Sequence, residues 1–370
     1  MAEALKHHIG PEVVRSLARD LSAAWGPFDG KAFARDALRG LEALELLPRG
    51  THIAGAMRRH LPAAYPEAVR VLVDSLGPPL GESDLTGMAV FRYLPYVAFI
   101  REYGVDHFEE SMAAQHALTQ RFTAEWCIRP FIERYPDATL ARLREWAIDS
   151  NVHVRRLVSE GTRPRLPWAP QLKAFMADPA PTLALLEMLK DDPERYVQRS
   201  VANHLNDIAK DHPDRVVAVA RDWSRGASEG RAWIVQHALR SLIKRGHRGA
   251  LTLLGGGAKP AVRVGRATFT PARVRVGQVV RFAFTLTSTS RRTQELIVDY
   301  TVHFVKADGS TKPKVFKLAK CTLAPGERVN LSGRVSLAVH TTRKPYPGRH
   351  RVDAQVNGLP YHLGSFVVTR

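Results

Sequence analysis

The hydrophobic pattern of this 370-residue chain changes once, at the stretch LLGGGAKPA (residues 253–261). Before this stretch, apolar residues recur every three or four positions, as in KAFARDALRGLEALELL and PTLALLEMLK, and this spacing predicts helices. After it, apolar and polar residues alternate, as in RFAFTLTS and ELIVDYTVHFVK, and this alternation predicts strands. The fold is therefore expected to combine an all-helical part with a separate β-part.

The β-part contains about seven short alternating runs, which favour a small β-sandwich of immunoglobulin-like type. Turn signals separate the runs at Asp308-Gly309, Pro325-Gly326, Pro347-Gly348 and Asn357-Gly358. Three consecutive glycines at 255–257 predict a hinge between the two parts. We therefore predict a helical-repeat domain over 1–254, a glycine-rich linker over 255–260 and a basic sandwich over 261–370.

The helical part contains an internal repeat. The segments TAEWC, VSEGT, VANHL and IVQHA align around a central polar residue, namely Glu125, Glu160, Asn203 and Gln236. Their spacings of 35, 43 and 33 residues match the loose period of HEAT-like helical pairs. The second helices of such a solenoid line one face, so we expect Glu125, Glu160 and Asn203 to be neighbours. Asp207 follows Asn203 by one helical turn and adds a carboxylate to that face.

Three further residues stand beside these positions, namely Trp126, Arg163 and Trp168. Carboxylates in a groove of a basic protein weaken polyanion binding unless they serve a cationic or developing-positive group. A tryptophan beside carboxylates is also the arrangement that a cation–π site uses. The alternative interpretation is structural, because acidic residues of solenoids are usually solvated or paired with arginines, and tryptophan usually packs in a core.

The charge of the chain lies mostly in its last third. The formal charge is +18, and residues 260–370 hold 19 Lys+Arg against 5 Asp+Glu, or +14, whereas residues 1–259 hold +4. Such a surplus favours a polyanion partner, either nucleic acid or an acidic membrane surface. The β-part is therefore expected to supply most of the electrostatic attraction.

Other features exclude several classes of protein. Two cysteines, Cys127 and Cys321, are too few for a disulfide framework or a cysteine metal site. The histidines lack metal-ligand spacing, and GGGAKP lacks the order of a phosphate-binding loop. No apolar run reaches the length of a membrane span, and the N-terminus lacks a signal-peptide pattern. We expect a cytoplasmic protein that uses no metal and no cofactor.

Several motifs of the helical part resemble those of one enzyme family. The stretches FDGKAFARDALRGLEALELLPRGTHIAGAMRRHLP, TAEWCIRPFIERYP, NVHVRRLVSEGTRPRLPWAPQL and DDPERYVQRSVANHLNDIAKDHPD occur in order. They resemble the AlkC-type DNA alkylation-repair glycosylases, bacterial HEAT-like repeat enzymes related to AlkD. The resemblance covers roughly residues 1–250, and a β-sandwich tail occurs in part of that family.

The resemblance implies hydrolysis of the N-glycosidic bond of cationic methylated bases, chiefly 3-methyladenine, with 3-methylcytosine and 1-methyladenine as further candidates. It also implies that the lesion is reached without a deep base-flipping pocket and that the product is an abasic site. Carried over to this sequence, the catalytic carboxylates are Glu125, Asp207 and Glu160. The lesion-facing residues are Trp168, Trp126, Asn203 and Arg163, of which the last would hold a phosphate near the lesion.

Basic residues are the candidates for contacts with the DNA backbone. In the helical part they are Arg155, Arg156, Arg165 and Arg199, and in the β-part they are Arg291, Arg292, Arg343 and Lys344. The expected partner is double-stranded DNA with alkylated bases, bound by a monomer. Two alternatives remain, namely a noncatalytic helical-repeat scaffold that binds nucleic acid and a repeat protein that docks a partner protein in its groove.

Overall fold

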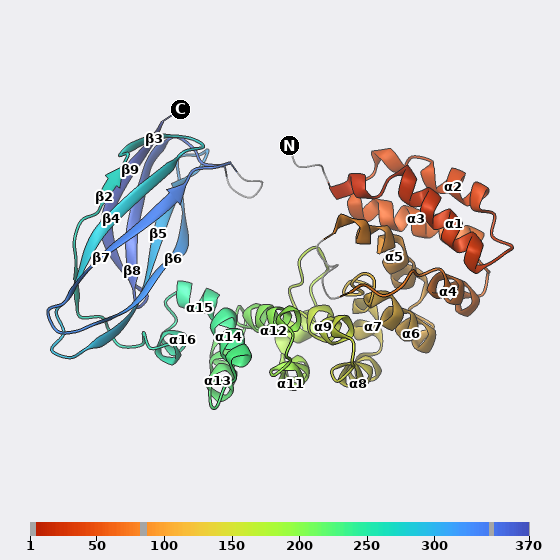
Figure 1. Ribbon diagram of the computed structural model, residues 1–370, viewed down its shortest axis with the longest axis horizontal. Coiled ribbons are helices and arrows are strands. Elements are labelled where there is room, and N and C mark those ends of the chain that lie inside the picture. Colours follow the sequence, from red (N-terminus) through yellow and green to blue (C-terminus); the bar gives the residue numbers. More distant parts are fainter. Residues whose placement is uncertain (1–4, 82–86, 340–343, 370) are drawn as a thin grey trace. The chain divides into compact units, whose positions relative to one another are not determined.

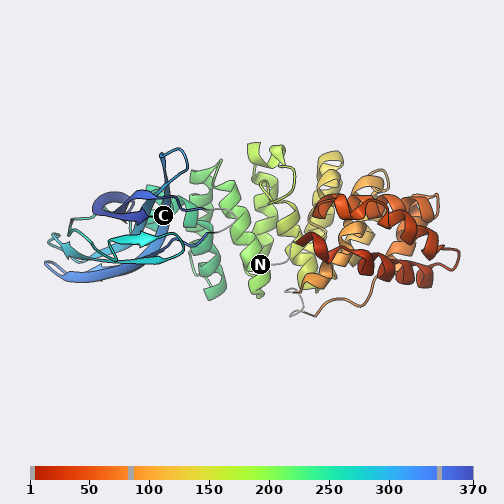
Figure 2. The ribbon, with the colours of Figure 1, turned by 90° about the horizontal axis from the view of Figure 1, so that it is seen from above.

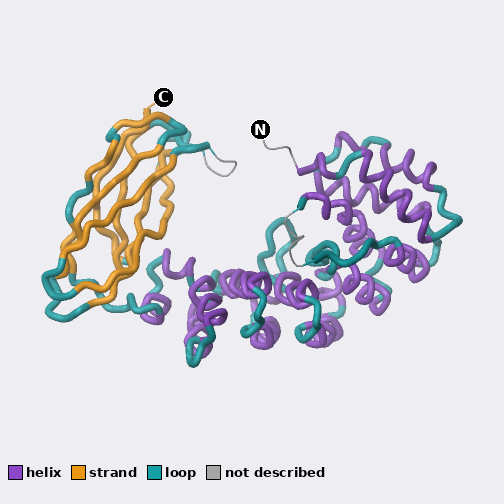
Figure 3. Tube along the Cα trace, viewed as in Figure 1, coloured by secondary structure: helices purple, strands orange, loops and turns teal. Residues whose placement is uncertain are grey.

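The computed structural model describes residues 5–81, 87–339 and 344–369. Helices continue to Leu253 and strands begin at Val262, as the colours of Figure 3 show. The chain forms two compact units, Met1–Asp211 with Gly226–Ile234 and His212–Arg225 with Val235–Arg370. The predicted class, a helical-repeat solenoid followed by an immunoglobulin-like sandwich, is confirmed.

The first unit is a HEAT-like stack of short helices joined by tight turns (Figure 1). Figure 2 shows the yellow and green helices of this unit lying side by side. Its complete α-helices are α1 (Pro11–Ala24), α2 (Gly30–Leu38), α3 (Leu46–His60), α4 (Tyr65–Asp74), α5 (Leu94–Tyr103), α6 (Phe108–Thr119), α7 (Arg129–Arg134), α8 (Pro136–Trp146), α9 (Val152–Gly161), α10 (Lys173–Ala177), α11 (Ala180–Leu189) and α12 (Arg195–Ile208).

Helix α9 shows how local sequence forms one of these elements. The Asn151 side chain caps the helix by accepting hydrogen bonds from the amides of His153 and Val154. Leu157 and Val158 are fully buried on the face toward the neighbouring helices. The helix therefore begins at a side-chain cap and is held in place by an apolar stripe.

The second unit begins with helices and ends with the sandwich. Its helices are α13 (Pro213–Trp223), α15 (Arg240–Lys244) and α16 (Arg248–Leu253), and α14 (Glu229–Ala238) spans the boundary between the units. The glycine segment is packed rather than free, because the Gly256 amide donates to the Leu251 carbonyl at 2.7 Å and Asn357 donates to the Ala258 carbonyl at 3.1 Å. The change from helix to strand falls at this segment, and its role as a hinge stays a prediction.

The sandwich consists of two sheets. The four-stranded sheet has the order β1-β4-β2, with β7 also paired to β4, and the five-stranded sheet has the order β3-β9-β8-β5-β6. All described strand pairs are antiparallel except β3 with β9. The strands are β1 (Val262–Val264), β2 (Thr268–Thr270), β3 (Arg273–Arg275), β4 (Val279–Ser288), β5 (Gln294–Val305), β6 (Thr311–Leu323), β7 (Arg328–Ser336), β8 (Gly348–Val356) and β9 (Leu359–Thr369).

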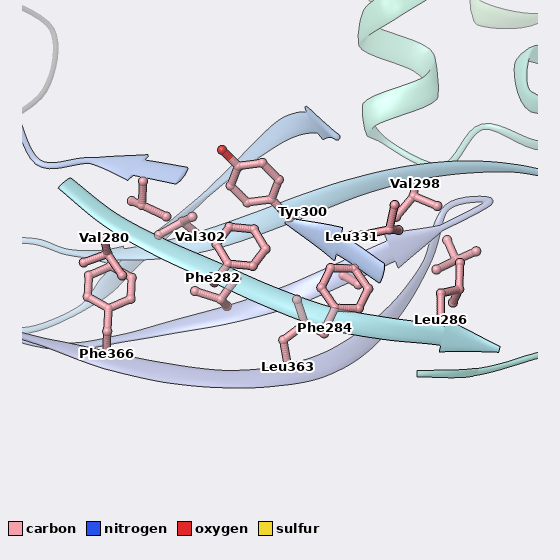
Figure 4. Packing of buried hydrophobic residues seen from close by; sticks show 14 of the residues in the cluster. Val280, Phe282, Phe284, Leu286, Val298, Tyr300, Val302, Leu331, Leu363 and Phe366 are labelled. Atoms are coloured by element: carbon pink, nitrogen blue, oxygen red, sulfur yellow. The ribbon is translucent and has the colours of Figure 1, made fainter. Parts of the chain in front are cut away.

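Alternating apolar residues of both sheets fill the core, including Phe282, Phe284, Tyr300 and Phe366 (Figure 4). Nine strands are present among the described residues, and three of them are only three residues long, which explains why the pattern suggests fewer. The run RVRVGQVV divides at Gly277, whose φ of +93° suits glycine, and its two halves join different sheets. Within the described ranges, no helix is long and apolar enough to cross a membrane.

Candidate functional site

Helices α9 and α12 meet through buried polar contacts. The Ser200 hydroxyl on α12 lies 2.9 Å from the Ser159 hydroxyl, and the His204 ring lies 2.9 Å from the Ser159 carbonyl oxygen. Ser200 also donates to the Glu160 carboxylate at 2.6 Å. These contacts set the end of α9 against α12, so that Glu160 and Asp207 lie near each other.

Six charged side chains then form a line of alternating charge, the carboxylate–arginine network: Glu125, Arg156, Glu160, Arg163, Asp207 and Lys210. At its first end, Arg156 Nη1 lies 2.6 Å from Glu125 Oε2, and Arg156 Nη2 lies 3.4 Å from Glu160 Oε1. Thr123 supports this end, because its hydroxyl donates to Glu125 and accepts from Arg156, each at 2.8 Å.

The other end of the network is more deeply buried. Arg163 donates to Glu160 Oε1 at 2.7 Å and to Asp207 Oδ2 at 2.8 Å. Lys210 reaches Asp207 Oδ1 at 2.8 Å. The exposed fraction of the side chain falls from 13% at Glu125 to 8% at Glu160 and 3% at Asp207. Glu125 is therefore the carboxylate of the network that solvent reaches best.

The network shifts the pKa values of its central members, Arg156 and Glu160, toward their charged forms. Burial raises the pKa of Glu160, but the attraction of Arg156 and Arg163 outweighs burial and holds the pKa below its usual value. Burial alone would lower the pKa of Arg156, yet Glu125 and Glu160 raise it above its usual value. Removal of one partner from this network leaves an uncompensated buried charge.

The loop after α9 carries the stretch SEGTRPRLPW and is held by Arg129. Arg129 is 3% exposed and donates to the carbonyls of Gly161 at 3.0 Å, Arg163 at 2.9 Å and Pro170 at 3.1 Å. Burial lowers the pKa of Arg129 to about 10. A Cβ atom at Gly161 would lie 2.7 Å from Ile128 Cγ2, so only glycine permits this close approach of α9. One buried arginine thus fixes both ends of the loop.

This loop presents Trp168 to solvent. Its indole is 64% exposed, its φ is +64°, and its ring centroid lies 6.5 Å from that of Trp126. A non-glycine residue at such a φ stores strain of about 1–3 kcal/mol, and strain of this kind concentrates at functional sites. The Nε1 atom of Trp126 is buried without a hydrogen-bond partner among the described residues. The exposed ring of Trp168 thus lies against the half-buried ring of Trp126, the residue that follows Glu125.

The chain resembles known proteins along its whole length. Residues 112–241 match the family model of DNA alkylation repair enzymes, and residues 263–370 match the model of the C-terminal Ig-like domain of the uncharacterised protein YhaZ. YhaZ of Bacillus subtilis (strain 168) is 35% identical over 96% of both chains. The alkylpurine DNA glycosylase AlkC of Pseudomonas fluorescens, solved bound to DNA containing an abasic site analog, is 38% identical over 100% of both chains, with a TM-score of 0.90.

The chain belongs to the AlkC-type family of DNA alkylation repair proteins. The resemblance predicted from the motifs is thereby confirmed. In this AlkC-type chain, the whole carboxylate–arginine network lies within the residues that match the alkylation-repair model. The sandwich corresponds to the Ig-like domain of YhaZ.

The structure brings together most of the residues that the repeat pattern singles out. Glu125, Glu160 and Asp207 belong to one network, and Asn203 lies half-buried on α12 one turn before Asp207. Glu125 departs from the expected alignment, because it lies in the turn before α7 and not on a helix. Its position in the network comes from the Arg156 side chain.

Three arginines that are predicted to contact DNA are paired with carboxylates. Arg155 and Arg156 are predicted to bind the DNA backbone, and Arg163 to hold a phosphate near the lesion. In the structure, Arg155 pairs with Asp192 at 2.6 Å, while Arg156 and Arg163 are largely buried between carboxylates. These ion pairs join neighbouring helices, and the contacts of the three arginines with DNA stay predictions.

The remaining backbone candidates stay predictions. Arg165 pairs with Asp211 at 2.7 Å but its side chain is 26% exposed. Arg199, Arg291, Arg292 and Lys344 are exposed on the surface, and Arg343 lies outside the residues that the structure describes. The exposed members can reach a phosphate without first breaking a buried ion pair.

The pattern misses several residues that shape the site. Arg129, Ser200 and His204 organise it, and Lys210 closes the end of the network. Burial lowers the pKa of His204 to about 4, so this ring is neutral near pH 7. One signal was available in the sequence, because Lys210 follows Asp207 at the i,i+3 spacing of helical ion pairs. Nothing in the sequence signals the contacts of Arg129, which join residues about 30–40 positions apart.

Proposed function

We propose that this protein is a monofunctional DNA glycosylase that releases cationic alkylated purines, chiefly 3-methyladenine, from double-stranded DNA by hydrolysis. The observation that carries the proposal is the exposed Trp168, whose ring lies 6.5 Å from that of the half-buried Trp126, next in sequence to Glu125 at the more accessible end of a buried carboxylate network. AlkC of Pseudomonas fluorescens, named as an alkylpurine DNA glycosylase, supports the assignment by its similarity over the full chain.

The chemistry requires little from the enzyme beyond negative charge and a placed water. An alkylated purine that carries a positive charge is already a good leaving group, and its departure leaves an oxocarbenium-like sugar. Carboxylates fixed in advance near that sugar stabilise the developing charge without reorganisation. We propose that Glu125, the most exposed carboxylate, faces the sugar and the attacking water. Asp207 and Glu160 contribute negative electrostatic potential at the site and hold Arg163 and Arg156 in place.

The lesion would be read by an open surface. With 64% of its side chain exposed, Trp168 offers an aromatic face without an enclosing pocket. A cationic base stacked on an indole gains cation–π energy that an ordinary base does not. This difference supplies selectivity for charged bases without a deep base-flipping pocket.

The sandwich would bind phosphates. Strands β1, β2, β4 and β7 contain no acidic residue, and Arg281 and Arg334 lie directly opposite each other on β4 and β7. Like charges in register repel each other, and an anion between them relieves that repulsion. We propose that this domain, with Arg291, Arg292 and Lys344, gives affinity for duplex DNA, and that a cytoplasmic monomer acts without metal or cofactor.

A noncatalytic scaffold that binds nucleic acid is the alternative, because ion pairs between carboxylates and arginines also occur in purely structural solenoids. Base release from methylated genomic DNA, resolved by chromatography, distinguishes the two. The proposal predicts free 3-methyladenine with the intact protein and a large loss with Glu125→Gln. Binding of DNA with no released base from the intact protein would establish the scaffold instead.

A further inference from the structure

A cavity of about 540 Å³ lies within the second unit, between its last helices and the outer face of the five-stranded sheet. The wall on the helix side includes Ile243 and Leu254, and the wall on the sheet side includes Ile297 and Ala319. Volumes of about 300–1,000 Å³ are typical of sites for small organic ligands. The cavity is remote in sequence from the carboxylate–arginine network and does not depend on the proposed function.

Close backbone packing holds the two walls of this cavity in place. A Cβ atom at Gly358, in the turn between β8 and β9, would lie 2.7 Å from Gly246 Cα. The Gln355 side chain donates to the Lys244 carbonyl at 3.2 Å. The helices therefore rest directly on the sandwich, and the cavity is a fixed feature of this unit.

Asp299 is the distinctive residue of the cavity. It follows Val298 on β5 at a bulge in the pairing with β6, and its side chain faces away from the sandwich core into the cavity wall. The residue is 5% exposed, and within the described chain its carboxyl group has no hydrogen bond or ion pair. Burial raises its pKa to about 6. The Asp299 oxygens are not among the buried polar atoms that lack a partner, so they meet solvent in the cavity. A ligand that supplies N–H donors would replace that solvent.

The charges around Asp299 favour a ligand that also carries negative charge. Lys244 and Lys317 both line the cavity and act on the Asp299 carboxyl through space, yet neither lies within ion-pair distance of it. Glu295 and Lys320 lie 3.4 Å apart and compensate each other. Lys244 and Lys317 thus face a single carboxylate, and their charges favour a ligand that also carries an anionic group such as a phosphate.

We propose that this cavity binds a guanine nucleotide, with the base donors on Asp299, the phosphate on Lys244 and Lys317, and the purine ring between Ile243 and Ile297. The Watson–Crick edge of guanine presents two adjacent N–H donors, which a carboxylate accepts side by side. Adenine and cytosine offer one exocyclic amino group and no second donor beside it. A flat ring suits apolar walls on opposite sides of the cavity.

The test measures binding of 2′-deoxyguanosine 5′-monophosphate to the full-length protein by calorimetry. We expect it to bind at least about tenfold more tightly than the deoxyadenosine analogue or inorganic phosphate, since one bidentate base contact gives about tenfold discrimination or more. Asp299→Asn should reduce the affinity for deoxyguanosine monophosphate at least about tenfold. The same variant should bind 2′-deoxyxanthosine monophosphate more tightly, because the C2 carbonyl of this base accepts a hydrogen bond from the new amide.

Matched variants distinguish binding at this site from nonspecific electrostatic attraction of the nucleotide to the basic protein. Asp308→Asn changes an exposed carboxylate in a turn of the same sandwich and should leave all affinities unchanged. Lys317→Ala, at an exposed position of β6, should reduce the affinity for the deoxyguanosine and deoxyadenosine monophosphates. Binding of deoxyguanosine, which lacks the phosphate, should be nearly unaffected. Because the switch from guanine to xanthine is a gain of affinity, a variant that merely misfolds cannot produce it.

Two results would overturn the proposal, namely equal binding of deoxyguanosine monophosphate and inorganic phosphate, or an unchanged base preference in Asp299→Asn. Competition by a short single-stranded oligonucleotide with one guanine then identifies the source of the ligand. Displacement at matching concentration indicates an unpaired nucleotide of DNA. Failure of the oligonucleotide to compete, with the mononucleotide still bound, indicates a free nucleotide.

Discussion

The helical unit and the sandwich use their positive charges in opposite ways. In the helical unit, Arg155, Arg156, Arg163 and Arg165 each pair with a carboxylate at 2.6–2.8 Å. In the described part of the sandwich, ten arginines form no ion pair: Arg263, Arg266, Arg273, Arg275, Arg281, Arg291, Arg292, Arg328, Arg334 and Arg349. A net charge alone would not separate these two situations.

Buried, paired charges and exposed, unpaired charges suit different functions. Buried pairs hold carboxylates charged in a fixed geometry, which is what stabilisation of a cationic transition state requires. Unpaired surface cations exchange water and counterions for phosphates with little loss, which is what affinity for DNA requires. We therefore propose that the helical unit performs the chemistry and that the sandwich provides affinity for DNA.

The largest effect expected concerns stability. Glu160→Gln removes the central carboxylate of the network and leaves Arg156 and Arg163 partly uncompensated, so the helical unit should lose about 3–5 kcal/mol. Glu327→Gln, at an exposed turn of the sandwich, should cost less than about 0.5 kcal/mol. Urea unfolding followed by circular dichroism measures both, and equal losses would contradict the difference between the two regions.

Acid should destabilise the helical unit through His204. Its folded pKa is lowered to about 4 by burial, so between the ordinary histidine pKa and about 4 the unfolded chain binds a proton that the folded chain does not. Stability present near pH 7 should fall as the pH drops through this window, by about 3 kcal/mol in all. In His204→Gln, the slope of unfolding free energy against pH should decrease by about 1.4 kcal/mol per unit. An unchanged slope would contradict this origin.

A smaller effect is expected at the aromatic surface. Trp168→Ala should slow release of 3-methyladenine by about 10- to 100-fold, because removal of the indole costs about 1–3 kcal/mol of stacking free energy per base. Affinity for an undamaged duplex should hardly change. Ile148→Ala, at another exposed apolar residue (77% exposed), is the matched control and should retain full activity. Equal loss of binding and release in Trp168→Ala would indicate a structural role for the indole.

The smallest effect separates unpaired from paired arginines. The double variant Arg291→Ala/Arg292→Ala should reduce the slope of log affinity against log salt by about two, or about one per phosphate contact. Arg165→Ala removes a cation already paired with Asp211 and should change the slope by clearly less. Fluorescence anisotropy with a short duplex over a range of salt measures both slopes. Similar changes in the two proteins would show that pairing does not govern DNA contact.

Periodicity and charge were sufficient to predict the main architecture. Apolar spacing of three and four gave the helices, and alternation with Asn357-Gly358 and Asp308-Gly309 gave the hairpins, because these patterns depend on local geometry. The repeat pattern also grouped Glu160 with Asp207. What it omitted was the partner of each charge, since Arg163 meets Asp207 across 44 positions of the chain.

Other features escape the sequence for a related reason. Glycines at 255–257 look flexible, but their small size allows Thr252 and Ile297 to pack closely against them. Arg129 looks like one more surface cation, yet it is buried and holds three carbonyl groups. Burial is a property of the assembled unit, so residue type alone does not reveal it.

The most direct test compares two buried aspartates of the helical unit that each hold an arginine. The side chains of Asp207 and Asp192 are each 3% exposed, and each carboxylate accepts from an arginine, Arg163 and Arg155 respectively. In single-turnover release of 3-methyladenine at saturating protein, Asp207→Asn should lose about 100- to 1,000-fold, whereas Asp192→Asn should retain nearly the rate of the unmodified protein. Equal rates for the two variants would contradict a catalytic network and leave both carboxylates with a structural role.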